Sequence, residues 1–163
     1  MEKTIVIMTL ATLLLYNVAG HAQNMAFISD KYTIECAGAD RNDGYLLRVT
    51  VEGKNVAEAQ KKVARSAVHG VLFNGFTGTA AGCITQQAMV ADSTVAVRNK
   101  DYFEKMFTTW NLSRYATVVV AQAAPPVRLK KGYRITTLVS VDKDQLRRQL
   151  EQDGIIKGLS SNF

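Results

Sequence analysis

Histidine, cysteine and proline are scarce in this chain, with two of each among 163 residues. Metal centres built on imidazole or thiolate groups draw on several such ligands, so the composition excludes an obvious zinc site and no metal or cofactor is expected. With few prolines and no low-complexity run, extended disorder is not expected either. The length suits one domain.

The chain also lacks a hydrophobic run long enough to span a bilayer comfortably, since its longest run covers residues 5–16. Lys3 precedes this run, and small residues stand at the ends of the triplet 20–22 (GHA). This order predicts a signal peptide over residues 1–22, cleaved between Ala22 and Gln23. The alternative is an uncleaved membrane anchor. No cysteine follows the run directly, so lipoprotein modification has no acceptor there.

Cys36 and Cys83 both remain after cleavage. An even number of cysteines in an oxidising compartment permits one disulfide. Two buried free thiols are the alternative, because free cysteine is common in protein cores.

His69 is the one histidine left after cleavage, because His21 belongs to the predicted signal peptide. A Ser-His-Asp triad or a Cys-His pair would have to use it. It stands on a predicted helix among small apolar residues, which is typical of a surface or partly buried structural histidine. The acidic pairs Asp40/Asp43 and Asp142/Asp144 lie in a turn and at a helix start, where carboxylates have structural roles. We therefore expect no catalytic residue.

The strongest helix signal covers residues 55–76. Asn55 is a suitable N-cap, and Glu58 stands at the capping-box position. Apolar residues recur along one face at helical spacing, whereas Ser66 and His69 are predicted on the polar side. This stripe predicts a helix packed flat on a sheet.

The remaining pattern predicts an α+β fold: an antiparallel sheet of about four strands with two or three helices packed on it. Predicted strands cover residues 32–37, 45–52, 115–121 and 127–141, the last best from Tyr133, and further helices cover 100–110 and 142–154. Residues 123–126 (AAPP) should break the third strand, and Lys130, Lys131 and Gly132 should form a hairpin tip. The structure of residues 83–98 is left open. One domain should span residues 23–154, followed by a tail over 155–163.

Phe103, Met106, Phe107 and Trp110 recur at helical spacing in the second predicted helix. We interpret this stripe as core, and an aromatic binding groove is the alternative.

The formal net charge of +6 allows contacts with anionic headgroups, cell-wall polymers or acidic proteins, although it can simply aid solubility. Arg128, Lys130, Lys131 and Arg134 are the candidate binding residues, and Arg147 and Arg148 could extend the patch. Nucleic acid is not an expected partner, because aromatic residues do not alternate with these cations. Any membrane contact should be peripheral.

Residues 58–76 (EAQKKVARSAVHGVLFNGF), with the glycine-rich loop and the Gly-Cys pair after them, resemble a family of uncharacterised exported proteins from gut Bacteroidales. The resemblance covers residues 32–84. More distantly, the strand–strand–helix order with residues 132–150 (GYRITTLVSVDKDQLRRQL) resembles the N-terminal domain family of flagellar assembly protein T and its lipoprotein relatives. These resemblances imply a small α+β envelope domain with an assembly role, and they assign no functional residue. This chain lacks the lipobox cysteine of the lipoprotein relatives.

The sequence therefore predicts a non-enzymatic exported envelope protein, an adaptor or assembly component that acts through protein–protein contacts. The alternative is a periplasmic binder of an anionic ligand or cell-envelope polymer. The expected location is the periplasm or outer envelope of a Gram-negative bacterium.

Overall fold

The computed structural model of the chain describes residues 27–40, 43–78 and 81–158. Its strands are β1 (Tyr32–Ala39), β2 (Tyr45–Gly53), β3 (Ala116–Leu129) and β4 (Gly132–Val141), and its α-helices are α1 (Val56–His69), α2 (Ser93–Arg98), α3 (Lys100–Thr109) and α4 (Lys143–Gln152). A π-helical turn, Gly70–Asn74, continues α1, and a 3-10 turn, Leu112–Arg114, follows α3. The predicted signal peptide and its cleavage site lie outside the described residues.

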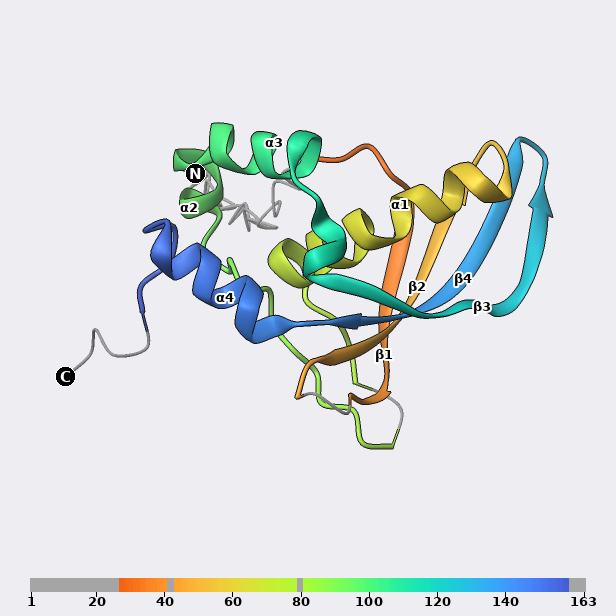
Figure 1. The fold of residues 1–163 in the computed structure, drawn as a ribbon, viewed down its shortest axis with the longest axis horizontal. Coiled ribbons are helices and arrows are strands. Elements are labelled where there is room, and N and C mark those ends of the chain that lie inside the picture. Colours follow the sequence, from red (N-terminus) through yellow and green to blue (C-terminus); the bar gives the residue numbers. More distant parts are fainter. Residues whose placement is uncertain (1–26, 41–42, 79–80, 159–163) are drawn as a thin grey trace, which may run out of the picture.

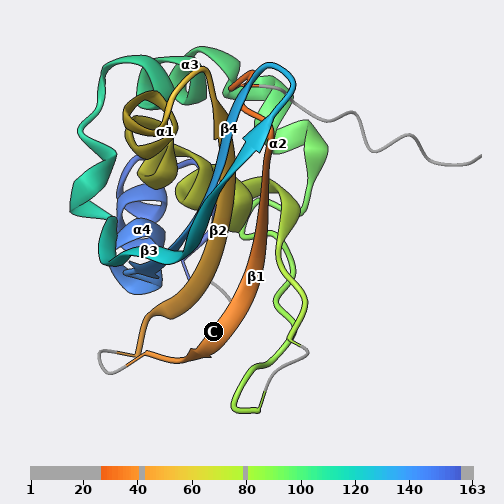
Figure 2. The same ribbon diagram turned by 90° about the vertical axis from the view of Figure 1, so that its right-hand side faces the viewer.

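The four strands form one antiparallel sheet in the order β1-β2-β4-β3, which confirms the predicted α+β class. Leu47, Val49 and Val51 of β2 are buried on the inner face, beside Ile135 and Val139 of β4. The alternation of these residues with polar ones fixes which face of the sheet is covered. Figures 1 and 2 show α1 and α4 on that covered side.

Helix α1 begins as the sequence predicts. The backbone N–H of Glu58 donates to Oδ1 of Asn55 at 2.8 Å, and the Glu58 carboxylate accepts from the backbone of Lys54 at 3.3 Å. The prediction that Ser66 and His69 lie on a polar face is wrong, because both are buried. Helix α1 is covered on two sides, by the sheet and by an aromatic cluster from the N-terminal segment, the π-helical turn and α3.

Helix α3 contributes the core side chains that its stripe predicts. Phe103, Met106 and Phe107 are buried, which confirms the core interpretation for these three residues. Phe27 and Phe73 pack against Phe103 with ring centroids 5.3 and 4.9 Å apart. Trp110, at the end of α3, is only partly buried.

Strand β3 corrects the prediction that residues 123–126 break the strand. It continues through Pro125 and Pro126 to Leu129, and β4 begins only at Gly132. The pairing with β4 shifts register three times between Val118 and Val127. An edge strand with such irregular pairing can hold prolines, because a residue there can do without a ladder hydrogen bond. Lys130 and Lys131 form the hairpin turn, as predicted.

Two further segments differ in detail from the sequence pattern. Helix α2 occupies part of the stretch left open by the sequence, and upstream of it Gln86 forms an isolated bridge with Phe76. Ile155, the first residue of the predicted tail, is buried against the core. Among the described residues, no helix is long and apolar enough to cross a membrane.

Candidate functional site

Cys36 and Cys83 form a disulfide, with the two sulfur atoms 2.09 Å apart. The predicted pairing is therefore confirmed, and the free-thiol alternative is excluded. Beside the bridge, the backbone N–H of Cys36 donates to the carbonyl oxygen of Thr77 at 3.3 Å. The segment after α1 thus lies along the outer edge of β1 and is held there covalently.

The four candidate binding residues lie near the β3–β4 hairpin tip, but they are not equally available. Arg134 donates to Glu52 Oε1 from Nε and Nη2, at 3.1 and 2.6 Å. Arg128 donates to the hydroxyl of Tyr133 at 3.2 Å and has no carboxylate partner among the described residues. Lys130 and Lys131 are exposed at the turn. Three cations are therefore available to a partner at this tip, and the fourth is neutralised.

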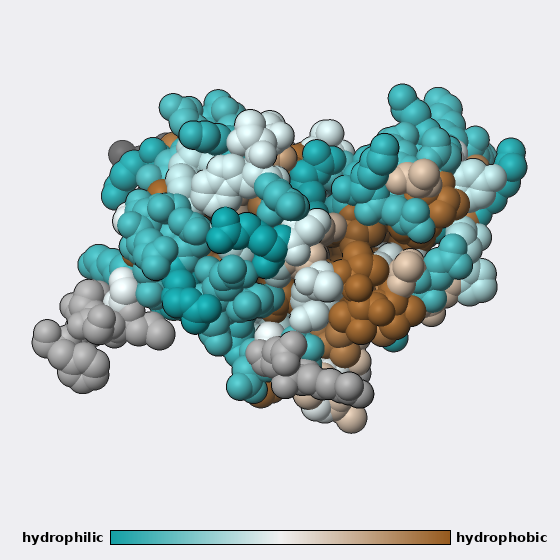
Figure 3. Space-filling view, in the orientation of Figure 1, coloured by the Kyte–Doolittle hydropathy of each residue, from teal (hydrophilic) through white to brown (hydrophobic). Residues whose placement is uncertain are grey.

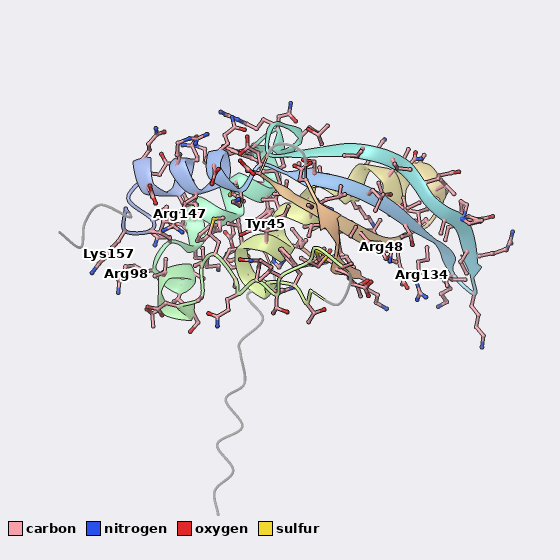
Figure 4. All side chains as sticks on the ribbon, turned by 90° about the horizontal axis from the view of Figure 1, so that it is seen from below. Tyr45, Arg48, Arg98, Arg134, Arg147 and Lys157 are labelled. Carbon is pink, nitrogen blue, oxygen red and sulfur yellow. A yellow bond between two sulfur atoms is a disulfide. The ribbon has the colours of Figure 1, made fainter. Side chains whose placement is uncertain are left out.

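The wider basic patch predicted with Arg147 and Arg148 does not assemble. Both residues belong to α4, and Figure 4 shows Arg147 and Arg134 toward opposite ends of the molecule. Arg147 is also paired with Glu151, with Nε 2.8 Å from Oε1. The hairpin tip and α4 are thus separate surfaces.

His69 is part of the core. Its Nδ1 lies 2.6 Å from the hydroxyl of Tyr32, and Asn74 donates to the same hydroxyl at 2.7 Å. The rings of Phe73 and Phe107 lie 5.1 and 5.3 Å from the imidazole. Burial, together with the charge of Asp30, raises the pKa of Tyr32 well above its ordinary value, so this phenol stays protonated at neutral pH. The cluster positions the end of α1 against β1.

One member of each acidic pair makes a structural hydrogen bond. Asp142 accepts from the backbone N–H of Gln145 at 2.8 Å and caps α4, and Asp40 accepts from the hydroxyl of Ser140 at 2.7 Å. Within residues 27–40, 43–78 and 81–158, no group of three or more His, Cys, Asp or Glu side chains could hold a metal ion.

Strand β3 carries the most exposed apolar surface on the sheet. The exposed fractions of Val118, Val119, Val120 and Val127 are 45%, 56%, 39% and 53%. Figure 3 shows the apolar surface over β3 facing the viewer. The sequence holds no charged residue from Ala116 to Val127. In the described sheet, β3 pairs with β4 along one edge, and the other edge of β3 has no partner strand.

Sequence reasoning missed this surface, although a signal for it is present. Residues 116–127 do not alternate between apolar and polar, and they include both prolines of the chain. Prolines are confined to edge strands and bulges, so their presence in a strongly strand-forming run marks an edge.

A second candidate is a groove of about 400 Å³ between α1 and the segment Trp110–Ser113. Two of its cations are already paired. Nζ of Lys62 lies 3.0 Å from Oε1 of Glu58, and Arg65 donates to both carboxylate oxygens of Asp30, at 2.8 and 2.9 Å. Lys61, also in the lining, is exposed and has no ion pair among the described residues. The groove thus offers one free cation beside the partly exposed Trp110.

Comparisons of the chain with protein-family models, curated proteins and solved structures gave no match. The surfaces of the molecule therefore carry the functional argument.

Proposed function

We propose that the chain is a non-enzymatic exported envelope protein, an adaptor or assembly component that acts through protein–protein contacts made by β3. The single observation behind this proposal is the exposed, uncharged surface of β3, centred on Val118, Val119 and Val120. Long, apolar and unpaired strand edges are uncommon in natural proteins, because they invite association with other chains. A protein that keeps such an edge has a use for it in binding.

Burial of the exposed valines and backbone pairing would both contribute free energy to a contact at this surface. Burying a valine side chain completely stabilises by about 1.5 kcal/mol or more, and half-exposed valines such as Val119 retain part of that gain for a partner. Backbone hydrogen bonds along the free edge would add to it. The non-enzymatic part of the proposal rests on His69, which is held in the core by Tyr32 and the aromatic rings.

Export is the second part of the proposal. The charge and hydrophobicity pattern of residues 1–22 supports a signal peptide, and the Cys36–Cys83 disulfide is of the kind that persists in oxidising compartments. The periplasm or outer envelope of a Gram-negative bacterium fits both features. Sequencing the N-terminus of exported protein tests this part: the account expects Gln23 or a residue close to it, and Met1 would contradict it.

The adaptor role is tested by capture of envelope proteins on the immobilised mature chain. Val119→Lys places a charge on the β3 surface, whereas Val97→Lys places the same charge on α2, where the valine is similarly exposed at 53%. We expect the captured proteins to be lost with Val119→Lys and kept with Val97→Lys. Equal capture by both variants, at unchanged melting temperatures, would overturn the proposal.

A periplasmic binder of an anionic ligand or cell-envelope polymer is the second candidate, favoured by Lys61 and Trp110 in the α1 groove. Cosedimentation with purified peptidoglycan at low and high salt tests it. Binding that falls steeply with salt and is weakened by Lys61→Glu would support this alternative, whereas salt-independent binding or no binding would count against it.

A further inference from the structure

The free edge of β3 has a definite usable length. Pro125 and Pro126 lack a backbone N–H, so they cannot donate to an added strand. The stretch from Ala116 to Ala124 before them has its full set of backbone donors. At the ordinary rise of a strand it extends for about 30 Å, enough for an extended segment of about nine residues.

Cations border the longer uncharged run, residues 116–127, at both ends. Arg114 precedes it and is exposed, with its guanidinium 5.0 Å from the ring of Tyr115. Arg128, Lys130 and Lys131 follow it at the hairpin tip. None of these four residues has a carboxylate partner among the described residues. The binding surface therefore consists of an apolar, uncharged centre between two positive ends.

A second copy of the chain fits this charge pattern poorly. Two identical edge strands related by a two-fold axis run antiparallel. Pairing β3 with itself would bring Arg128 and the two lysines of one copy beside Arg114 of the other, at both ends of the interface. Like charges in this position oppose association.

We propose that β3 takes up, as a fifth strand, an extended segment of a partner protein with alternating apolar residues at its centre and acidic residues at its ends. The apolar residues cover exposed valines of β3, the backbone groups pair with its free edge, and the carboxylates meet the cations at the two ends. This inference rests on the proposed adaptor function and names the chemistry of its partner.

Labelled synthetic peptides test the inference by fluorescence anisotropy on the full mature chain. The first peptide alternates valine and threonine and carries two glutamates at each end, and the second has lysines in their place. We expect the acidic peptide to bind at least tenfold more tightly at low salt, and this preference should shrink at high salt.

Charge reversal at the hairpin tip locates the binding. Lys131→Glu should weaken binding of the acidic peptide about fivefold, whereas Lys157→Glu, an exposed residue at the far end of the molecule, should leave it within twofold. Both lysines are exposed, so neither change should unfold the protein. Equal affinity for the two peptides, or equal effects of the two variants, would overturn the inference.

Sedimentation velocity tests the remaining alternative, in which a second copy of the chain binds β3. A monomer is expected at micromolar concentration, and a dimer that Val119→Lys dissociates would overturn the inference in favour of a second copy. If neither peptide binds while protein capture still depends on Val119, strand addition is wrong and the adaptor function stands. If capture is independent of Val119 as well, both are wrong.

Discussion

The two edge strands of the sheet, β1 and β3, differ in whether their outer edges are covered. The outer edge of β1 is covered by the segment after α1, through the hydrogen bond from Cys36 to Thr77 and the bridge to Cys83. The free edge of β3 carries exposed valines and has no partner among the described residues. Figure 2 shows the covering loop beside β1. One edge is thus closed covalently, and the other stays open.

Only part of the outer edge of β3 is open to an added strand. Pro125 and Pro126 protect the half next to the hairpin tip, as prolines do on natural edge strands. The half from Ala116 to Ala124 has no proline and no charge. Its pairing with β4 shifts register between Val118 and Val120 and again before Ala124, so among the usual protections of an edge strand it has irregular pairing but neither a charge nor a covering loop among the described residues. Its exposed valines, within a domain that covers its other edge, are the observation on which the proposed binding surface rests.

The largest expected effect comes from opening the covered edge. Replacing Cys36 and Cys83 together by alanine removes a bridge between residues 47 positions apart, which should lower the free energy of unfolding by about 4 kcal/mol in the chain-entropy model. Urea unfolding measures this change, with reductant added to the wild type as a second route. A loss below about 1 kcal/mol would mean that the covered edge of β1 is stable without its bridge.

The next effect concerns the turn that holds β3 in place. Gly132 has a φ of +115°, and an added Cβ would collide with the backbone carbonyl of Gly53. Gly132→Ala should cost about 2–4 kcal/mol. Gly154→Ala is the matched control, since Gly154 also has a positive φ, +69°, but nothing within 4 Å of an added Cβ. It should cost about 1 kcal/mol, from backbone strain alone. Equal losses of stability in the two variants, measured by thermal unfolding, would show that the close approach to Gly53 does not contribute to the cost.

A smaller effect is expected at Tyr32, which links β1 to His69 and Asn74. Tyr32→Phe should cost about 1 kcal/mol at neutral pH, because two hydrogen bonds to the hydroxyl are lost. Burial, with Asp30, raises the pKa of Tyr32 in the folded state above the ordinary value of 10.0. Its contribution to stability is therefore complete below pH 10 and declines as the pH rises further. Alkaline unfolding should be less steep in the variant, and identical pH profiles would contradict this account.

The smallest effect on stability is expected on the open edge. Val119 is 56% exposed, so Val119→Lys should change the free energy of unfolding by less than about 0.5 kcal/mol. A loss of 2 kcal/mol or more in urea unfolding would mean that Val119 is part of the folding core and that β3 is not an open surface.

Much of the fold follows from local patterns in the sequence. Alternation in residues 45–52 and 133–141 identifies the inner face of the sheet, and Asn55 with Glu58 fixes the start of α1. Expected export and an even number of cysteines permit the disulfide, although they leave two free thiols as an alternative. These features depend on neighbours along the chain or on a simple count.

The rest depends on contacts between distant segments. His69 is buried because Tyr32 and Phe107 cover it from two other elements, which helical periodicity cannot show. Arg134 is removed from the basic patch by Glu52, which becomes its neighbour only when β2 pairs with β4. The exposure of β3 follows from the strand order, of which the strand itself gives only one sign, the prolines Pro125 and Pro126.

Hydrogen exchange at residue resolution, with and without the acidic valine–threonine peptide, tests the open edge most directly. The account predicts that the peptide slows amide exchange in Ala116–Ala124. Exchange in β1, whose outer edge is covered by the segment that contains Thr77, should be unchanged. Exchange in β3 that is already slow in the free protein and unaffected by the peptide, or slowing confined to β1, would contradict it.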